Sequence, residues 1–153
     1  EDLAEAGFSD VRTYVQSGNI VVRSSLSSAD EVGAAVRKVV AERFDVDTPV
    51  IVRTGAQLAK VLAWNPFPDA AAERPNLVAV LHLTGKPDAA AVRELLAEDH
   101  SPVRLAHRGE EVVVDWHERS GVPRVDRALK KLGVDGTARN WRTLTALVDL
   151  ARE

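Results

Sequence analysis

The sequence contains no cysteine and no methionine among its 153 residues. The lack of cysteine excludes disulfide bonds, cysteine-ligated zinc and thiol nucleophiles, and nothing in the composition implies an oxidising compartment. The longest apolar runs, such as residues 77–83, are too short to span a bilayer. We therefore expect no membrane partner and a cytoplasmic location.

An excess of charge of either sign is also missing, because 20 Lys and Arg residues oppose 23 Asp and Glu residues. No overall field therefore favours nucleic acid, and any binding surface must be local. The four histidines are scattered, so we expect no metal site. The chain has no phosphate-binding glycine loop, dinucleotide fingerprint or serine nucleophile elbow, so we expect no cofactor.

What the sequence does contain is regularly spaced apolar residues between clear start and stop signals. Ser28 and Thr54 are each followed three residues later by Glu or Gln, which is typical of a helix start, and Asp88 is a third cap. The expected elements are a helix end closing at Gly7, strands over 11–16 and 20–24, a helix from 28, a strand over 48–53, a helix from 54 to 65, a strand over 76–83, a helix from 88, strands over 103–108 and 111–116, and helices from 123 and near 137.

Two hairpins are expected. A Gly109-Glu110 turn sets Arg104 opposite Asp115 and Arg108 opposite Glu111, so that apolar pattern and charge agree on one register.

For the first hairpin we favour a Gly18-Asn19 turn, which sets Val15 opposite Val22 and Tyr14 opposite Arg23. A Ser17-Gly18 turn would instead set Arg12 against Arg23, at a like-charge cost.

This order of elements predicts an α+β fold of two ferredoxin-like α/β plait units, followed by C-terminal helices. One strand restored before residue 1 would complete the order βαββαβ in the first unit, and the second unit repeats the order strand, helix, hairpin, helix. The N-terminal unit spans residues 1–64, a linker loop spans 65–75, and the C-terminal α+β unit spans 76–153. Because residues 1–7 read as the end of a helix, we expect an upstream segment to be missing.

Three segments, in this order and at these distances, resemble the bacterial family of domain of unknown function 1697: Tyr14-Val15-Gln16-Ser17-Gly18-Asn19-Ile20-Val21, Asn65-Pro66-Phe67, and Gly136-Thr137-Ala138-Arg139-Asn140-Trp141 followed by Thr143. The resemblance implies ferredoxin-like elements and no agreed activity, and it identifies this chain as a member without the N-terminal strand and glycine loop. A Gly-Arg-Ser-Lys-Leu-like run is typical of similar proteins, but here it reads Gly121-Val122-Pro123-Arg124-Val125, so a Ser/Lys pair is absent.

The start of the last helix is the strongest candidate for a ligand site. Gly136, Thr137 and Asn140 would leave backbone N–H groups open there, and Arg139 and Arg142 would add positive charge, a combination that holds phosphate or carboxylate. Residues 118–142 contain seven basic and three acidic side chains. The structural alternative is that Thr137 and Asn140 only cap the helix and the arginines are solvated.

The sequence thus favours a binding protein for a phosphorylated or otherwise anionic ligand, or for nucleic acid, through a basic C-terminal surface that includes Arg124. The alternative is a small-molecule enzyme with a site between the two halves, completed by the missing N-terminal loop. The candidate ligand-binding residues for these hypotheses are Asn19, Asn65, Arg124, Arg139, Asn140 and Arg142. No catalytic residue is predicted.

A third hypothesis is an accessory protein that acts through its sheet surface. Tyr14 and Val21 would leave the first hairpin partly apolar on both faces, and an apolar surface of this kind can contact a partner.

Overall fold

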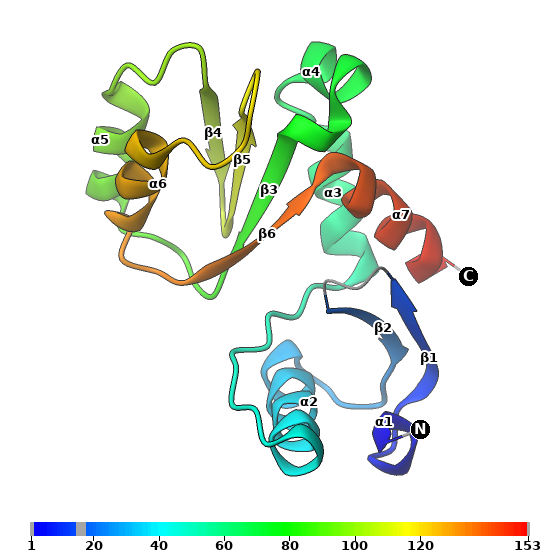
Figure 1. Cartoon of the computed structure of the whole chain (residues 1–153). Helices are drawn as coiled ribbons and strands as arrows, with labels where there is room; N and C mark the ends of the chain where they lie inside the picture. Colours follow the sequence, from blue (N-terminus) through cyan, green and yellow to red (C-terminus); the bar gives the residue numbers. More distant parts are fainter. Residues whose placement is uncertain (1, 15–17, 153) are drawn as a thin grey trace. The chain divides into compact units, whose positions relative to one another are not determined.

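The computed structural model describes residues 2–14 and 18–152, so the expectations for Val15, Gln16 and Ser17 lie outside the described residues. The chain divides into two compact units (Figure 1). Unit 1 comprises residues 1–58 and 147–153, and unit 2 comprises residues 59–146. Within the described part of the chain, no helix is long and apolar enough to cross a membrane.

Unit 1 begins with a short helix that closes where the sequence predicted. The helix ends before Gly7, whose φ of +97° suits glycine, and Phe8 N–H donates to the Leu3 carbonyl at 3.1 Å. The elements of the unit are α1 (Asp2–Glu5), β1 (Ser9–Tyr14), β2 (Asn19–Arg23), α2 (Ala29–Phe44), the first residues of α3 (Gly55–Trp64) and the last residues of α7 (Trp141–Arg152).

The two capping signals of this unit also form. The Ser28 hydroxyl accepts from the Glu31 N–H at 3.2 Å at the start of α2. At the start of α3, Thr54 Oγ1 accepts from the Gln57 N–H at 3.0 Å and Gln57 Oε1 accepts from the Thr54 N–H at 2.8 Å. Local sequence therefore fixes both helix starts.

Both registers considered for the first hairpin are wrong. Tyr14 pairs with Asn19 and Arg12 with Val21, so the connection spans residues 15–18. The expected cost of bringing Arg12 and Arg23 together does not arise, because Asp10 lies between their charges. Asp10, at an irregularity in β1, accepts hydrogen bonds from Arg12 at 2.7 Å and from Arg23 at 3.1 Å. One carboxylate thus compensates both arginines.

The strand expected over residues 48–53 does not form. Residues 45–54, all of them described, contain no helix or strand. A strand requires a hydrogen-bonded neighbour, and the sheet of unit 1 comprises β1 and β2 alone among the described residues. The segment still packs on α2, because a Cβ on Gly33 would lie 3.4 Å from the Val50 carbonyl oxygen.

Unit 2 is a ferredoxin-like plait. Its strands form one antiparallel sheet in the order β4-β5-β3-β6, with β3 between β5 and β6. Residues 65–75, expected as a linker loop, contain a helix and a 3₁₀ turn and lie within this unit. After α3, the elements are α4 (Pro68–Glu73), η1 (Pro75–Leu77), β3 (Val78–Leu83), α5 (Ala89–Ala97), β4 (Arg104–Arg108), β5 (Glu111–Asp115), α6 (Pro123–Lys130), β6 (Gly136–Asn140) and α7 (Trp141–Arg152).

The second hairpin has the predicted register. Arg104 pairs with Asp115 and Arg108 with Glu111. The predicted register is confirmed because the apolar alternation and the charge pairs of β4 and β5 favour the same alignment.

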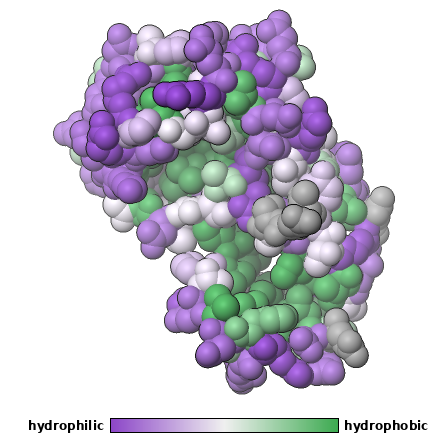
Figure 2. All heavy atoms as spheres, in the orientation of Figure 1, coloured by the Kyte–Doolittle hydropathy of each residue, from purple (hydrophilic) through white to green (hydrophobic). Residues whose placement is uncertain are grey.

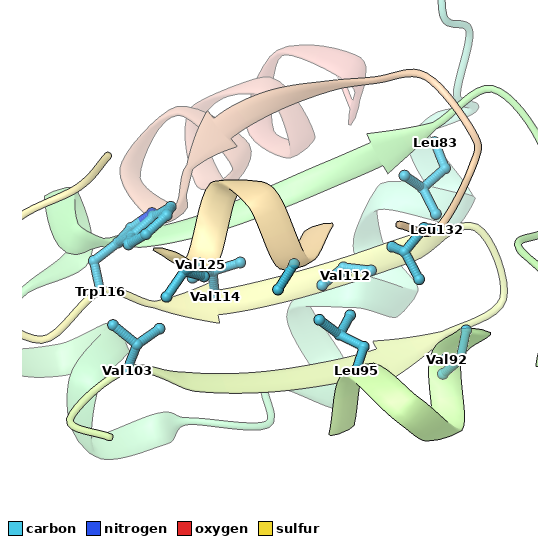
Figure 3. Close-up of a cluster of buried hydrophobic side chains, with 10 residues drawn as sticks. Leu83, Val92, Leu95, Val103, Val112, Val114, Trp116, Val125 and Leu132 are labelled. Carbon is cyan, nitrogen blue, oxygen red and sulfur yellow. The ribbon is translucent and has the colours of Figure 1, made fainter. Parts of the chain in front are cut away.

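The main core lies between this sheet and the helices α5 and α6 (Figure 3). Val112 and Val114 of β5 point toward Leu95 of α5 and Val125 of α6, and Trp116 closes one end. Burying a Val or Leu side chain contributes about 1.5–3 kcal/mol, so this cluster contributes much of the stability of unit 2.

The final helix starts later than the sequence predicted. Gly136 and Thr137 were expected at the mouth of that helix, but they belong to β6, which pairs with β3, and α7 begins at Trp141. Strand pairing is one reason for this, and steric fit is the other. A Cβ on Gly136 would lie 2.9 Å from the His82 carbonyl oxygen, so glycine allows β6 to approach β3 this closely.

We therefore predict that Gly136→Ala lowers the free energy of unfolding by about 1–3 kcal/mol, as expected for overpacking against backbone. Gly85→Ala is the control, because its Cβ would meet no atom nearer than 3.9 Å. Urea unfolding of both variants tests this. Equal midpoints for the two variants would show that β6 does not approach β3 as described.

Candidate functional site

The strand register places four polar side chains in one row across the sheet of unit 2. Arg108 is the partner of Glu111, Glu111 of His82, and His82 of Thr137. Cross-strand partners point to the same face of a sheet, whereas Val112, next to Glu111 in the chain, points into the core. This polar row therefore lies on the face opposite to α5 and α6.

His82 and Glu111 form a buried pair at the centre of the polar row, with only 5% and 9% of each residue exposed. Nδ1 of His82 hydrogen-bonds Oε2 of Glu111. In the described part of the chain no buried side-chain nitrogen or oxygen lacks a partner, and His82 bonds through Nδ1 alone. Nε2 of His82 must therefore reach solvent.

Such a pair is chemically useful. A carboxylate on Nδ1 selects the tautomer with the proton on that nitrogen and holds the ring in one orientation. The opposite nitrogen, Nε2 of His82, is then the proton-accepting nitrogen of the ring. A carboxylate that orients a histidine is a recurring arrangement in general acid–base catalysis.

Arg139 lies beside the polar row. It pairs with Val80 in the next row of the same face, and its Nη1 donates to Thr137 Oγ1 at 2.7 Å and to the Ala138 carbonyl at 2.8 Å. The side chain is half-buried, and burial lowers the pKa of the Arg139 guanidinium below its ordinary value. A cation partly removed from water favours an anionic neighbour.

The other end of the same sheet face holds an ion-pair network. Asp115 is fully buried and accepts from Arg74 at 2.8 Å, from Arg104 at 2.8 Å and from the His117 N–H at 3.0 Å. Burial alone would raise the pKa of Asp115, but the hydrogen bonds from Arg74 and Arg104 outweigh it and lower the pKa overall. Arg104 also binds Asp69 at 3.0 Å. This network is self-contained and structural.

The predicted residues near the final helix do not form one site, because each of them has different contacts. Asn140 caps α7, because its Oδ1 accepts from the Thr143 N–H at 2.9 Å. Arg142 is exposed on the first turn of α7. The Arg139 guanidinium turns back along β6 toward Thr137, away from that helix start. The amide-rich mouth flanked by two arginines therefore does not form.

The other three predicted residues lie elsewhere. Arg124, near the start of α6, donates to the carbonyls of Asp99 and Ser101, on the sheet face opposite to Arg139. Asn65 follows α3 with a φ of +32°. Asn19, in unit 1, is buried and donates through Nδ2 to the Tyr14 carbonyl at 3.2 Å.

The sequence reasoning missed the His82–Glu111 pair. The sequence patterns predict a strand over residues 76–83 and set Glu111 opposite Arg108, but they do not align β3 with β5. The predicted fold could have revealed this alignment, because the ferredoxin-like order places the first strand (β3) between the third (β5) and the fourth (β6). Among the described residues, no three His, Cys, Asp or Glu side chains come together as a metal site requires.

Comparison with known proteins gives one match. The model of the family described as Protein of unknown function (DUF1697) matches residues 1–112 of the 153. No curated protein and no solved structure matches the chain.

We predict that Asp115→Asn lowers the free energy of unfolding at neutral pH by about 3 kcal/mol, because two guanidiniums lose a buried counter-charge. Asp47→Asn is the matched control. Asp47 also binds one arginine, Arg37, but it is exposed, so its loss should change stability little. Denaturant unfolding of both variants provides the comparison.

The effect of Asp115→Asn should also depend on pH. Because folding lowers the pKa of Asp115, its contribution is fully present above the unfolded value of about 3.9 and is lost as pH falls through the folded value. The difference in the free energy of unfolding between wild type and Asp115→Asn should therefore decrease below about pH 4. A difference that stays constant down to pH 2 would contradict an ionised Asp115.

Proposed function

Because the chain belongs to this family of proteins of unknown function, DUF1697, we propose its function from the geometry of unit 2: it binds a small phosphorylated or otherwise anionic ligand beside the polar row, with Arg139 as the principal contact. Asn140 follows it in the chain, and Arg142 lies three residues after it. The half-buried guanidinium of Arg139, hydrogen-bonded to the Thr137 hydroxyl in the strand position opposite His82, carries the proposal.

The burial of the Arg139 side chain supports this assignment. Burial lowers the pKa of Arg139, so an anion at that position would relieve the desolvation of the guanidinium. A guanidinium also presents two parallel N–H donors, which match the oxygens of a phosphate or carboxylate.

A small ligand fits the charge distribution better than nucleic acid does. Of the seven basic residues in 118–142, three (Arg124, Arg127 and Lys130) lie on α6, which covers one sheet face, whereas Arg139 lies on the other face. Arg124 on α6 is therefore not continuous with Arg139. Nucleic-acid binding requires several cations along one path, since it depends on contacts to successive phosphates.

The test is titration of the whole chain with inorganic phosphate and with pyrophosphate, followed by calorimetry. Arg139→Gln should weaken binding at least about tenfold, which corresponds to about 1.4 kcal/mol. Arg139→Lys should be intermediate, because it keeps the charge and loses the two-pronged donor. Arg124→Gln is the matched control and should bind like wild type.

Two results would overturn the proposal. One is equal binding of phosphate by wild type and Arg139→Gln. The other is tighter binding of a single-stranded oligonucleotide that Arg124→Gln, but not Arg139→Gln, weakens.

The His82–Glu111 pair favours a second candidate, a small-molecule enzyme that hydrolyses a phosphate monoester. His82 Nε2 would take a proton from water while the water oxygen bonds to phosphorus. The bond from phosphorus to the alcohol oxygen would break, and that oxygen would gain a proton from solvent. Arg139, beside Thr137, would hold the phosphate oxygens.

For this candidate we expect slow hydrolysis of p-nitrophenyl phosphate by the wild-type chain. His82→Gln should reduce turnover by about 10²–10⁴-fold. His107→Gln is the control histidine, since His107 bonds a backbone carbonyl at a hairpin end. Turnover that survives in His82→Gln, or none in wild type, would rule out this second function without affecting the binding proposal.

A further inference from the structure

The outer side of α6 in unit 2 is strongly basic. Residues 119–131 contain five basic side chains and one acidic side chain, whereas the whole chain has a net charge of −3. The five basic residues are all exposed, namely Arg119, Arg124, Arg127, Lys130 and Lys131. The last four of these belong to α6 and its C-cap, and we refer to them as the cationic face of α6.

The spacing of these cations places them on one side of the helix. Residues three, four or seven positions apart lie on one helical face, and Arg124, Arg127 and Lys131 are spaced in this way. The opposite side is buried in the core of unit 2 and consists of Val125, Ala128 and Leu132. At 1.5 Å per residue, the cationic face is about 10 Å long. Figure 2 shows mostly hydrophilic atoms over the part of unit 2 in which Figure 1 places α5 and α6.

Two cations of this face have no partner within the described part of the chain. Lys131 pairs with Glu98 of α5 at 3.7 Å, and Arg124 donates to two backbone carbonyls. Arg127 and Lys130 make no hydrogen bond and no ion pair to any residue within 2–14 and 18–152. Their charges, at the middle and the end of α6, are therefore available to a partner from outside the chain.

The helix dipole explains only part of this arrangement. It stabilises cations near the C-terminal end of a helix, where Lys130 and Lys131 lie, but it disfavours a cation in the first turn, where Arg124 lies. Like charges three or four residues apart also repel each other, and Arg127 has such neighbours toward both ends of the helix. A partner of opposite charge would relieve this repulsion.

The extent of the cationic face favours an acidic helix over nucleic acid as that partner. On the side of α5, the face is bordered by the exposed carboxylates of Glu98 and of Glu94, one turn earlier. The positive charge is therefore confined to one helix, whereas nucleic acid needs cations along an extended path. Carboxylates three or four residues apart on a facing helix repeat every 5.4 Å, as the cations of α6 do. Charge pairs between helices that lie side by side also select partners in coiled coils.

We propose that the cationic face of α6 is a docking site for an acidic helix of a partner protein, in which Asp or Glu recurs every three or four residues. Arg127 and Lys130 supply the principal contacts. Because the contact is electrostatic, it weakens with salt and governs the choice of partner more than the affinity. α6 covers the sheet face opposite to Arg139, so this site is separate from the proposed anion site.

The experiment uses the whole chain and a fluorescein-labelled, alanine-based peptide of fourteen residues. Its four glutamates stand at i, i+4, i+7 and i+11, which lie on one face of a helix. The control peptide has the same composition, with glutamates at i, i+2, i+7 and i+9, which lie on two opposite faces. Fluorescence anisotropy reports binding. At about 20 mM salt the first peptide should bind at least about fivefold more tightly than the control, and at about 200 mM salt it should lose at least about tenfold in affinity.

A matched pair of double variants locates the binding surface. Arg127→Gln with Lys130→Gln should weaken binding at least about tenfold, because the two cations without internal partners are lost. Lys86→Gln with Arg93→Gln removes the same charge from exposed positions of unit 2 outside the cationic face, and it should bind like wild type. All four substituted side chains are exposed, so the urea midpoints of both variants should match that of wild type.

Four results would overturn the proposal. The first is equal binding of the peptide by the two double variants, which would show that net charge alone drives binding. The second is equal affinity for the two peptides. The third is tighter binding of a single-stranded oligonucleotide of equal charge, lost in the Arg127 and Lys130 variant, which would identify nucleic acid as the partner. The fourth is self-association of the chain in sedimentation, lost in the same variant, which would identify a second copy.

Discussion

The antiparallel pairing of β3 with β5 and β6 is the constraint on which the rest of unit 2 depends. It closes the core under α5 and α6 on one face of the sheet. On the other face, the same register brings His82 opposite both Glu111 and Thr137 and sets Arg139 one row away. A shift of one residue would turn each of these side chains to the opposite face, so fold and candidate site depend on the same alignment.

Much of this architecture could be predicted from the sequence, because local signals agree with the global fold. The capping pairs at Ser28 and Thr54, the cap at Asp88 and the register that joins Arg104 to Asp115 are all confirmed. Each depends on residues close in the chain or on two independent patterns that agree.

The errors arose where long-range pairing outweighs local preference. Residues 48–53 have strand-forming side chains, but no strand within residues 2–14 and 18–152 pairs with them. Gly136 resembles a helix start, although β6 needs glycine there for its close approach to His82. The His82–Glu111 pair is formed by two strands 29 residues apart, which no local pattern reports.

The central claim is that Arg139, beside the polar row, contacts an anion. The most direct measurement is nitrogen NMR of the arginine and histidine side chains while phosphate is added to the whole chain. The account predicts saturable shifts of the Arg139 Nε–H and of His82 Nε2, with the Arg124 signal unchanged. Shifts confined to Arg124 or Arg142, or none at Arg139 at saturating phosphate, would contradict it.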